Sequence, residues 1–161
     1  MMKVNILETD TGRILEDELR DWSQAALNQL DKAYGYKSFR PGQLEAVNTI
    51  LNGRDLIAVM PTGSGKSVCY QLPAMRAGHL TLVVSPLRAL MRDQVQALQA
   101  RGVAAALIDS GVTPKRRRSI YDMAHGGGLR ILYVAPERLF ADDFTAFAQS
   151  TRVDLIAIDE A

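Results

Sequence analysis

Met60-Pro61-Thr62-Gly63-Ser64-Gly65-Lys66-Ser67 follows an apolar run over residues 55–60 and leads into an amphipathic segment. A glycine-containing turn between a strand and a helix presents backbone N–H groups and a helix N-terminus to phosphate oxygens. Gly63 and Gly65 permit the close backbone approach that such a ligand needs. The flanking patterns therefore favour a nucleoside triphosphate site over a chance glycine turn.

The residues of this loop have distinct expected tasks. Thr62, Gly63, Ser64 and Gly65 supply the backbone that surrounds the phosphates of ATP. Lys66 is expected to reach the β- and γ-phosphates, and the Ser67 hydroxyl to ligate Mg²⁺. The general pattern places a glycine where this chain has Met60, which is a departure.

Two adjacent carboxylates, Asp159 and Glu160, follow the apolar segment 153–158. Asp159 is expected to hold Mg²⁺, and Glu160 to polarise the water that attacks the γ-phosphate. Carboxylates at the end of a strand can equally form a solvated turn. The phosphate-binding loop upstream favours the catalytic interpretation, because hydrolysis needs a positioned metal and water as well as bound phosphates.

Short apolar runs alternate with amphipathic segments along most of the chain. The pattern predicts an α/β fold with a mostly parallel sheet and helices on both faces. The expected strands cover residues 55–60, 80–84, 103–108, 130–134 and 153–158. The expected helices run from 14 to about 33, from 42 to 51, from 65 onward, from 86 to 101 with Ser85 as cap and Pro86 in the first turn, from 114 to about 124, and in two pieces from 136 to about 150.

Composition restricts the classes of function. With 19 basic and 18 acidic residues, any nucleic-acid site must be a local patch. The single cysteine, Cys69, excludes an internal disulfide and is expected to be a buried helix residue, not a nucleophile. The sequence has neither a long apolar run nor the apolar core of a signal peptide, so we expect no membrane association and a cytoplasmic location, at the nucleoid if the source is bacterial.

Five ordered segments resemble the first RecA-like lobe of RecQ-family DNA helicases. They are Phe39-Arg40-Pro41-Gly42-Gln43, the loop 60–67, Ser85-Pro86-Leu87-Arg88-Ala89-Leu90-Met91-Arg92-Asp93-Gln94, Ala135-Pro136-Glu137-Arg138-Leu139 and Asp159-Glu160-Ala161. In that family the loop normally follows a methionine, so Met60 fits. The resemblance covers residues 34–161 as an incomplete ATP-binding domain, with residues 1–33 as a separate segment that carries an amphipathic helix.

The resemblance assigns further residues to ligands. Gln43 would read the adenine edge, with Tyr36 and Arg40 packed on the faces of the base. Ser85 and Pro86, and likewise Pro136 and Arg138, would contact the backbone of single-stranded DNA. The alternative for Arg40 and Gln43 is that they are exposed residues at the start of a helix.

Several charged or aromatic residues have two readings. Arg88 stands where the family usually has an apolar residue, so it is either an added DNA phosphate contact or part of a solvated helix face, which we favour. The run 115–118 (Lys-Arg-Arg-Arg) opens a helix and suggests an anionic partner, although a solvated face is the commoner explanation. His79 and His125 lack metal-ligand spacing, and Trp22 is expected to pack.

The resulting hypothesis is the ATP-binding and hydrolysing lobe of a 3′–5′ DNA helicase that acts in repair and recombination. We expect the 161-residue chain to be a fragment truncated after the Walker B strand, without the second RecA-like lobe and C-terminal domains, and inactive in unwinding on its own. The alternatives are a non-catalytic nucleotide- or DNA-binding module and an RNA helicase of the related Asp-Glu-Ala-Asp family.

Overall fold

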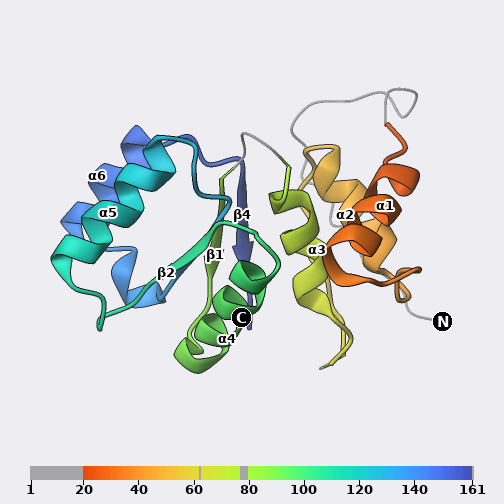
Figure 1. Ribbon diagram of the computed structural model, residues 1–161, viewed down its shortest axis with the longest axis horizontal. Coiled ribbons are helices and arrows are strands. Elements are labelled where there is room, and N and C mark those ends of the chain that lie inside the picture. Colours follow the sequence, from red (N-terminus) through yellow and green to blue (C-terminus); the bar gives the residue numbers. More distant parts are fainter. Residues whose placement is uncertain (1–19, 62, 77–79, 161) are drawn as a thin grey trace. The chain divides into compact units, whose positions relative to one another are not determined.

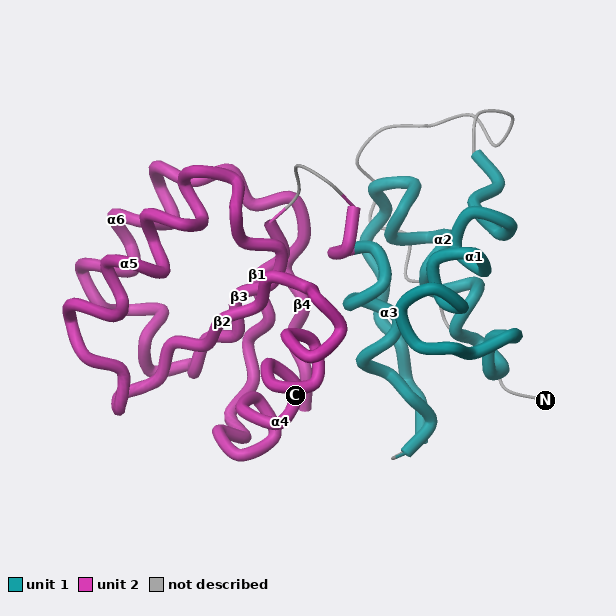
Figure 2. Tube along the Cα trace, viewed as in Figure 1, with its two compact units in different colours: residues 1–73 teal, residues 74–161 magenta. Residues whose placement is uncertain are grey.

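The computed structural model describes residues 20–61, 63–76 and 80–160. The chain divides into two compact units, residues 1–73 and 74–161 (Figure 2). Each unit is described by itself below. The domain boundary near residue 34 stays a prediction, and the start of the helix expected from residue 14 lies outside the described residues.

The first unit holds three helices, α1 (Ser23–Tyr34), α2 (Gln43–Leu51) and α3 (Lys66–Ala74) (Figure 1). The helix α1 buries Ala26 and Leu30 four residues apart, which is the spacing of one helical face. It ends at Gly35, whose φ of 72° suits a left-handed C-cap. Asn48 of α2 accepts the backbone N–H of Trp22 at 3.1 Å and so fixes the start of α1 against α2.

The strand expected over residues 55–60 is not formed. Residues 54–60 form neither helix nor strand in the described structure, and Ile57 and Val59 are 55% and 75% exposed. Only Met60 of this run is buried, against Ala46 and Cys69. A strand is defined by its hydrogen-bonded neighbour, and an apolar run in the sequence does not say whether that neighbour is present.

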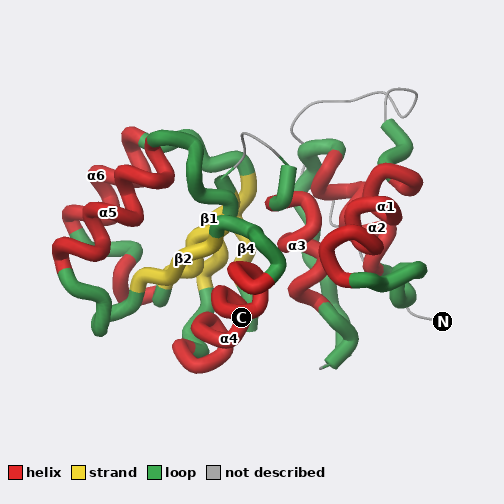
Figure 3. Tube along the Cα trace, viewed as in Figure 1, coloured by secondary structure: helices red, strands yellow, loops and turns green. Residues whose placement is uncertain are grey.

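The second unit contains a parallel four-stranded sheet in the order β2-β3-β1-β4 (Figure 3). Its strands are β1 (Thr81–Val84), β2 (Ala105–Ile108), β3 (Ile131–Val134) and β4 (Leu155–Ile158). All three ladders run in parallel over four residue pairs, so that Val84, Ile108, Val134 and Ile158 end at one level. The parallel α/β class predicted from the sequence is therefore confirmed.

Helices cover the sheet on both faces. The helices α5 (Pro114–His125) and α6 (Asp142–Ser150) bury Ile120, Tyr121, Phe144 and Phe147 against one face of the sheet (Figure 1). The helix α4 (Arg88–Ala100) contacts β2 and buries the stripe Met91, Val95 and Leu98. A short 3₁₀ helix, η2 (Pro136–Arg138), leads from β3 toward α6, as the expected two-piece helix predicted.

The expected start of α4 is wrong by two residues. The helix begins at Arg88 with Leu87 as its N-cap, so Pro86 precedes the first turn and Ser85 makes no capping hydrogen bond. The Ser85 Oγ instead accepts the N–H of Leu87 at 3.3 Å, because a serine hydroxyl can satisfy a backbone donor two residues on and form a turn. Among the described helices, none has the length and apolar character that crossing a membrane requires.

Candidate functional site

The glycine loop of the first unit leads directly into α3. Lys66 is the first residue of that helix and Ser67 the second, one residue later than the start expected at Gly65. Gly63 and Gly65 have φ values of 75° and 83°, which side chains with a Cβ rarely adopt. Thr62, expected to line the phosphates, lies outside the described residues.

Two side chains from the 39–43 segment hold the carbonyl oxygens of this loop. Arg40 Nη1 donates to Gly63 O at 2.6 Å. Gln43 Nε2 donates to Ser64 O at 3.2 Å and to Gly65 O at 3.0 Å. The carbonyl groups of three successive residues of the loop are thus bonded to side chains more than twenty positions earlier.

The position of Gln43 differs from the exposed alternative considered above. Its side chain is buried, and its Oε1 accepts the backbone N–H of Arg40 at 2.9 Å. Both ends of the carboxamide are therefore engaged within the unit. Sequence reasoning missed this positioning role for Gln43 and Arg40, and the adenine contact stays a prediction. One signal was available in the sequence. Gln43 lies at the start of a helix, three and four residues before the apolar Ala46 and Val47, so it shares their buried face.

An aromatic pair and a cavity adjoin this segment. The Tyr36 ring, 51% exposed, stacks on Tyr34 with 6.0 Å between ring centroids. The Tyr34 hydroxyl donates to Gln71 Oε1 of α3 at 2.7 Å, which ties the pair to the helix that follows the loop. A cavity of about 740 Å³ is lined by parts of α1, α2 and residues 37–42, including Arg40. Lys37, the residue after Tyr36, lines this cavity, and a cavity of this size suits a small organic ligand.

The loop also fits an anionic ligand by its own unsatisfied chemistry. The Ser64 Oγ is buried and has no hydrogen-bond partner among the described residues. A buried hydroxyl without a partner costs free energy, and a bound phosphate oxygen would satisfy it. Gly63 has no atom within 4 Å of the position that a Cβ would take, so the loop is open on that side.

Cys69 is confirmed as a buried residue of α3. Its Sγ lies 3.9 Å from Met60 Sδ, and the side chain packs with Ala46. Burial raises the pKa of the Cys69 thiol to about 11. A thiol with that pKa is almost wholly protonated near neutral pH, so little of the reactive thiolate is present.

The paired carboxylates lie at the end of β4 in the second unit. Asp159 is buried, and its N–H donates to Val84 O at 2.9 Å, which extends the β1–β4 ladder by one bond. Its Oδ1 accepts the N–H of Glu160 at 3.1 Å. Glu160 is exposed and has a φ of 57°, which turns the chain sharply after the strand. One carboxylate is therefore fixed inside the fold and the next faces solvent.

Arg88 belongs to an ion-pair cluster, which neither sequence reading anticipated. Its Nε donates to Asp109 Oδ2 at 3.0 Å, and Arg92 Nη2 donates to the same oxygen at 3.1 Å. Asp109 is buried at the end of β2 and also accepts the Gly111 N–H at 2.8 Å. Burial alone would raise the pKa of Asp109, but the hydrogen bonds from Arg88 and Gly111 hold that pKa below its ordinary value.

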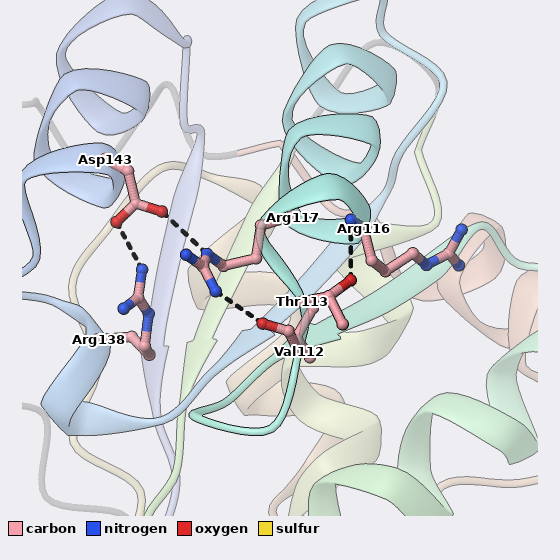
Figure 4. A network of polar contacts seen from close by, with 6 residues as sticks. All are labelled: Val112, Thr113, Arg116, Arg117, Arg138 and Asp143. Atoms are coloured by element: carbon pink, nitrogen blue, oxygen red, sulfur yellow. Dashed lines mark hydrogen bonds and ion pairs between the residues drawn. The ribbon is translucent and has the colours of Figure 1, made fainter.

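Arg138 lies in a second cluster, shown in Figure 4. The carboxylate of Asp143, at the start of α6, accepts hydrogen bonds from Arg138 Nη2 and, at 2.9 Å, from Arg117 Nε of α5. Arg117 also donates to Val112 O at 2.6 Å. Burial opposes ionisation of Asp143, yet the two guanidinium groups keep its pKa below the ordinary value. The side chain of Arg138 is only 16% exposed, so most of its surface is used inside the unit.

The remaining candidates lie where the strands end. Ser85 and Pro86 follow β1, and Pro136 follows β3, so these segments lie at the same edge of the sheet as Asp159. Whether any of them contacts DNA stays a prediction. His125 packs its ring edge-on against Phe147 and its Nε2 lies 3.1 Å from Ser150 Oγ, while His79 lies outside the described residues. The described part of the chain holds no group of three metal-ligating side chains.

Comparison with known proteins gives consistent matches. A family model described as "DEAD/DEAH box helicase" matches residues 40–161. The chain is 46% identical over 136 residues to "ATP-dependent DNA helicase RecQ" of Haemophilus influenzae, a match that covers 84% of this chain and 22% of that protein. It is 43% identical over 132 residues to the protein of the same name from Bacillus subtilis, covering 80% and 22%. The chain therefore spans about a fifth of the length of these relatives.

A solved structure supports the fold. The crystal structure of the DUF1998 helicase MrfA bound to DNA superposes with a TM-score of 0.65 and covers 91% of this chain and 21% of the other. The sequence identity is 21%, so this likeness concerns the fold alone.

Proposed function

Because the chain belongs to the DEAD/DEAH box helicase family, we propose that it binds and hydrolyses ATP as the first lobe of a RecQ-type DNA helicase. The predicted resemblance to RecQ-family helicases is confirmed by the two relatives described above. One observation carries the proposal. Arg40 and Gln43 hold the carbonyls of the glycine loop, and the buried Ser64 hydroxyl has no hydrogen-bond partner among the described residues, which a phosphate would provide.

The proposed roles follow from the chemistry of each side chain. Lys66, at the N-terminus of α3, neutralises the β- and γ-phosphates, where the helix dipole also favours negative charge. Ser67 and Asp159 are the oxygen ligands that would hold Mg²⁺, which supplies charge neutralisation at the transferred phosphoryl group. Glu160, which is exposed, orients the attacking water.

The finer assignments are also part of the proposal. They are unwinding with 3′–5′ polarity, action in DNA repair and recombination, a cytoplasmic location, and cooperation with a second RecA-like lobe. In such enzymes an arginine from another element stabilises the transition state, so the lobe proposed here binds ATP by itself and hydrolyses it efficiently only with that partner. The two curated relatives, both named as ATP-dependent DNA helicases, support a DNA partner.

Binding of a fluorescent ATP analogue with Mg²⁺ tests the first step in the 161-residue chain. We expect Lys66→Ala to weaken binding at least about tenfold, since a charge-assisted contact to phosphate is lost. Glu160→Gln should bind normally, and Lys32→Ala, an exposed lysine of α1, is the matched control. Equal binding by all variants would contradict the assignment of the loop.

A chimera tests the later steps. Replacing the matching 136 residues of the Haemophilus influenzae helicase by this chain's sequence should preserve DNA-stimulated ATP hydrolysis and unwinding. Glu160→Gln in the chimera should abolish hydrolysis while nucleotide binding persists. If the chimera binds nucleotide and DNA but never hydrolyses ATP, the non-catalytic module becomes the better description.

A further inference from the structure

The start of α5 carries three exposed cations, Lys115, Arg116 and Arg118, which we call the α5 basic patch. None of the three lies within ion-pair distance of a carboxylate in the described part of the chain. Arg117, between them in sequence, behaves differently, because its side chain is 18% exposed and bonded to Asp143. In Figure 4 the Arg116 side chain extends away from that network.

The location of the patch is unfavourable for cations within the helix itself. The helix has Thr113 as its N-cap, whose Oγ1 accepts the Arg116 N–H at 3.3 Å, and Pro114 in its first turn. Such a well-defined N-terminus carries the positive end of the helix dipole, which repels Lys115 and Arg116. The patch is thus a concentration of positive charge that the fold does not neutralise, in a chain with nearly balanced charge.

An exposed aromatic residue is attached to the same framework. Phe140 lies between η2 and α6 and is 88% exposed. The residues on either side of it, Arg138 and Asp143, are bonded to each other, and Asp143 is bonded to Arg117 of α5. The Arg117–Asp143–Arg138 network therefore connects the segment that carries Phe140 to the helix turn that carries the patch (Figure 4).

We propose that the α5 basic patch and Phe140 form an additional binding surface for single-stranded DNA. The cations contact backbone phosphates, and Phe140 stacks on a base. The segments 109–113 and 135–141 both follow strands that end at one level, so the surface belongs to the strand-exit edge where parallel sheets bind ligands. This proposal rests on the proposed function, since the polymer is the strand that the helicase would engage.

Single-stranded DNA is favoured over an acidic peptide by the aromatic side chain. An acidic peptide would be bound by the cations alone and would leave Phe140 exposed to water. A nucleobase of single-stranded DNA would stack on the Phe140 ring. The two components also predict different experimental signatures, because phosphate contacts depend on salt and stacking does not.

The test measures the affinity of the 161-residue chain for a fluorescently labelled mixed-sequence single strand by anisotropy, over a range of salt concentrations. The triple variant Lys115→Gln, Arg116→Gln, Arg118→Gln should bind at least about tenfold more weakly, with a plot of log K against log salt that is less steep by about 2, or 0.7 for each lost phosphate contact. The matched control changes Arg101, Arg130 and Arg152, three arginines that follow α4 or precede β3 and β4, to Gln.

Phe140→Ala should weaken binding at least about fivefold without changing the salt slope, and Phe140→Leu should recover little, because stacking needs a planar ring. Far-UV circular dichroism and ATP-analogue binding should remain at wild-type values in all variants, which separates this proposal from the nucleotide site. If the triple variant keeps the affinity and slope of the control, the surface is not a DNA site. Tighter wild-type binding to a polyglutamate peptide than to DNA would also overturn the proposal.

If the wild-type chain binds nucleotide but no single strand, this proposal fails while the ATP site stands. If Lys66→Ala leaves nucleotide binding unchanged but the patch variants lose DNA binding, the proposed ATP site fails and the DNA surface stands.

Discussion

The Gln43 side chain lies directly against Gly65, so that a larger residue at position 65 would displace it. Gln43 Nε2 donates to Gly65 O at 3.0 Å, and a Cβ placed on Gly65 would lie 2.7 Å from the same nitrogen. The glycine is therefore required twice, for its φ of 83° and for the space that the glutamine occupies. In this structure Gln43 supports the glycine loop, and its contact with adenine stays a prediction.

Gly65→Ala should destabilise the first unit more than Gly63→Ala. Both glycines have positive φ, so both substitutions carry a backbone cost of about 1 kcal/mol. Only at Gly65 does the new methyl group also displace the buried Gln43. Chemical unfolding followed by circular dichroism should give a difference of at least about 1 kcal/mol between the variants, within the range expected for a lost buried hydrogen bond. Equal losses would show that Gln43 moves aside freely.

Gln43→Glu should weaken nucleotide binding while preserving the bond from the Arg40 N–H. The carboxylate can still accept that donor, but it offers no hydrogen to Ser64 O or Gly65 O. A buried acceptor facing two acceptors costs about 1–3 kcal/mol. Titration with the ATP analogue should show the loss, and an exposed substitution of the same type, Gln96→Glu on α4, serves as the control.

Asp109→Asn should destabilise the second unit by about 2 kcal/mol at neutral pH, since two charge-assisted hydrogen bonds from Arg88 and Arg92 weaken. The pKa of Asp109 is lowered in the folded state, so its stabilisation is present above the unfolded-state pKa of about 3.9 and is lost as the pH falls through the folded value. Unfolding measured against pH should therefore show the two proteins converging below about pH 4. A difference that persists in acid would contradict an ionic origin.

Arg138→Ala should lower the stability of the second unit more than it lowers the affinity for DNA. The side chain is mostly buried and bonded to Asp143, and its removal leaves that carboxylate with Arg117 alone. Arg138→Lys should not restore stability fully, because a lysine cannot reproduce the planar guanidinium geometry. Thermal unfolding and DNA anisotropy measured on the same samples compare the two roles. A loss of DNA affinity with unchanged stability would favour the direct contact predicted from the sequence.

Native Cys69 should resist alkylation at mildly alkaline pH. Its pKa of about 11 and its burial leave little thiolate and no access for the reagent. Iodoacetamide followed by mass spectrometry should show labelling only after denaturation. Rapid labelling of the native protein would mean that α3 opens readily around this residue.

The sequence was a good guide to elements whose signals are local. Apolar runs ending at Val84, Ile108, Val134 and Ile158 predicted four strands with the ends that are observed, and the glycines after Leu51 and Tyr34 marked helix ends. These features depend on side-chain period and backbone freedom, which neighbouring residues determine.

The failures concern interactions between distant residues. The segment 55–60 has the composition of a strand, but strand formation requires a paired neighbour that composition cannot reveal. Arg88 is exposed, as a solvated helix face requires, but nothing local indicates that Asp109, 21 positions later, accepts its hydrogen bond. The grip of Gln43 on the loop, across 22 positions, was invisible for the same reason.

The level ends of the four strands have an evolutionary consequence. The strands β1, β2, β3 and β4 end at matched register positions. Each exit segment, by which we mean the residues that directly follow a strand, therefore starts from a strand that is already held in the sheet. Exposed positions on an exit segment that are not bonded to another segment can then change without disturbing the sheet. A lineage can thus acquire residues such as Lys115 or Phe140 one at a time and diversify its recognition of ligands on an unchanged scaffold.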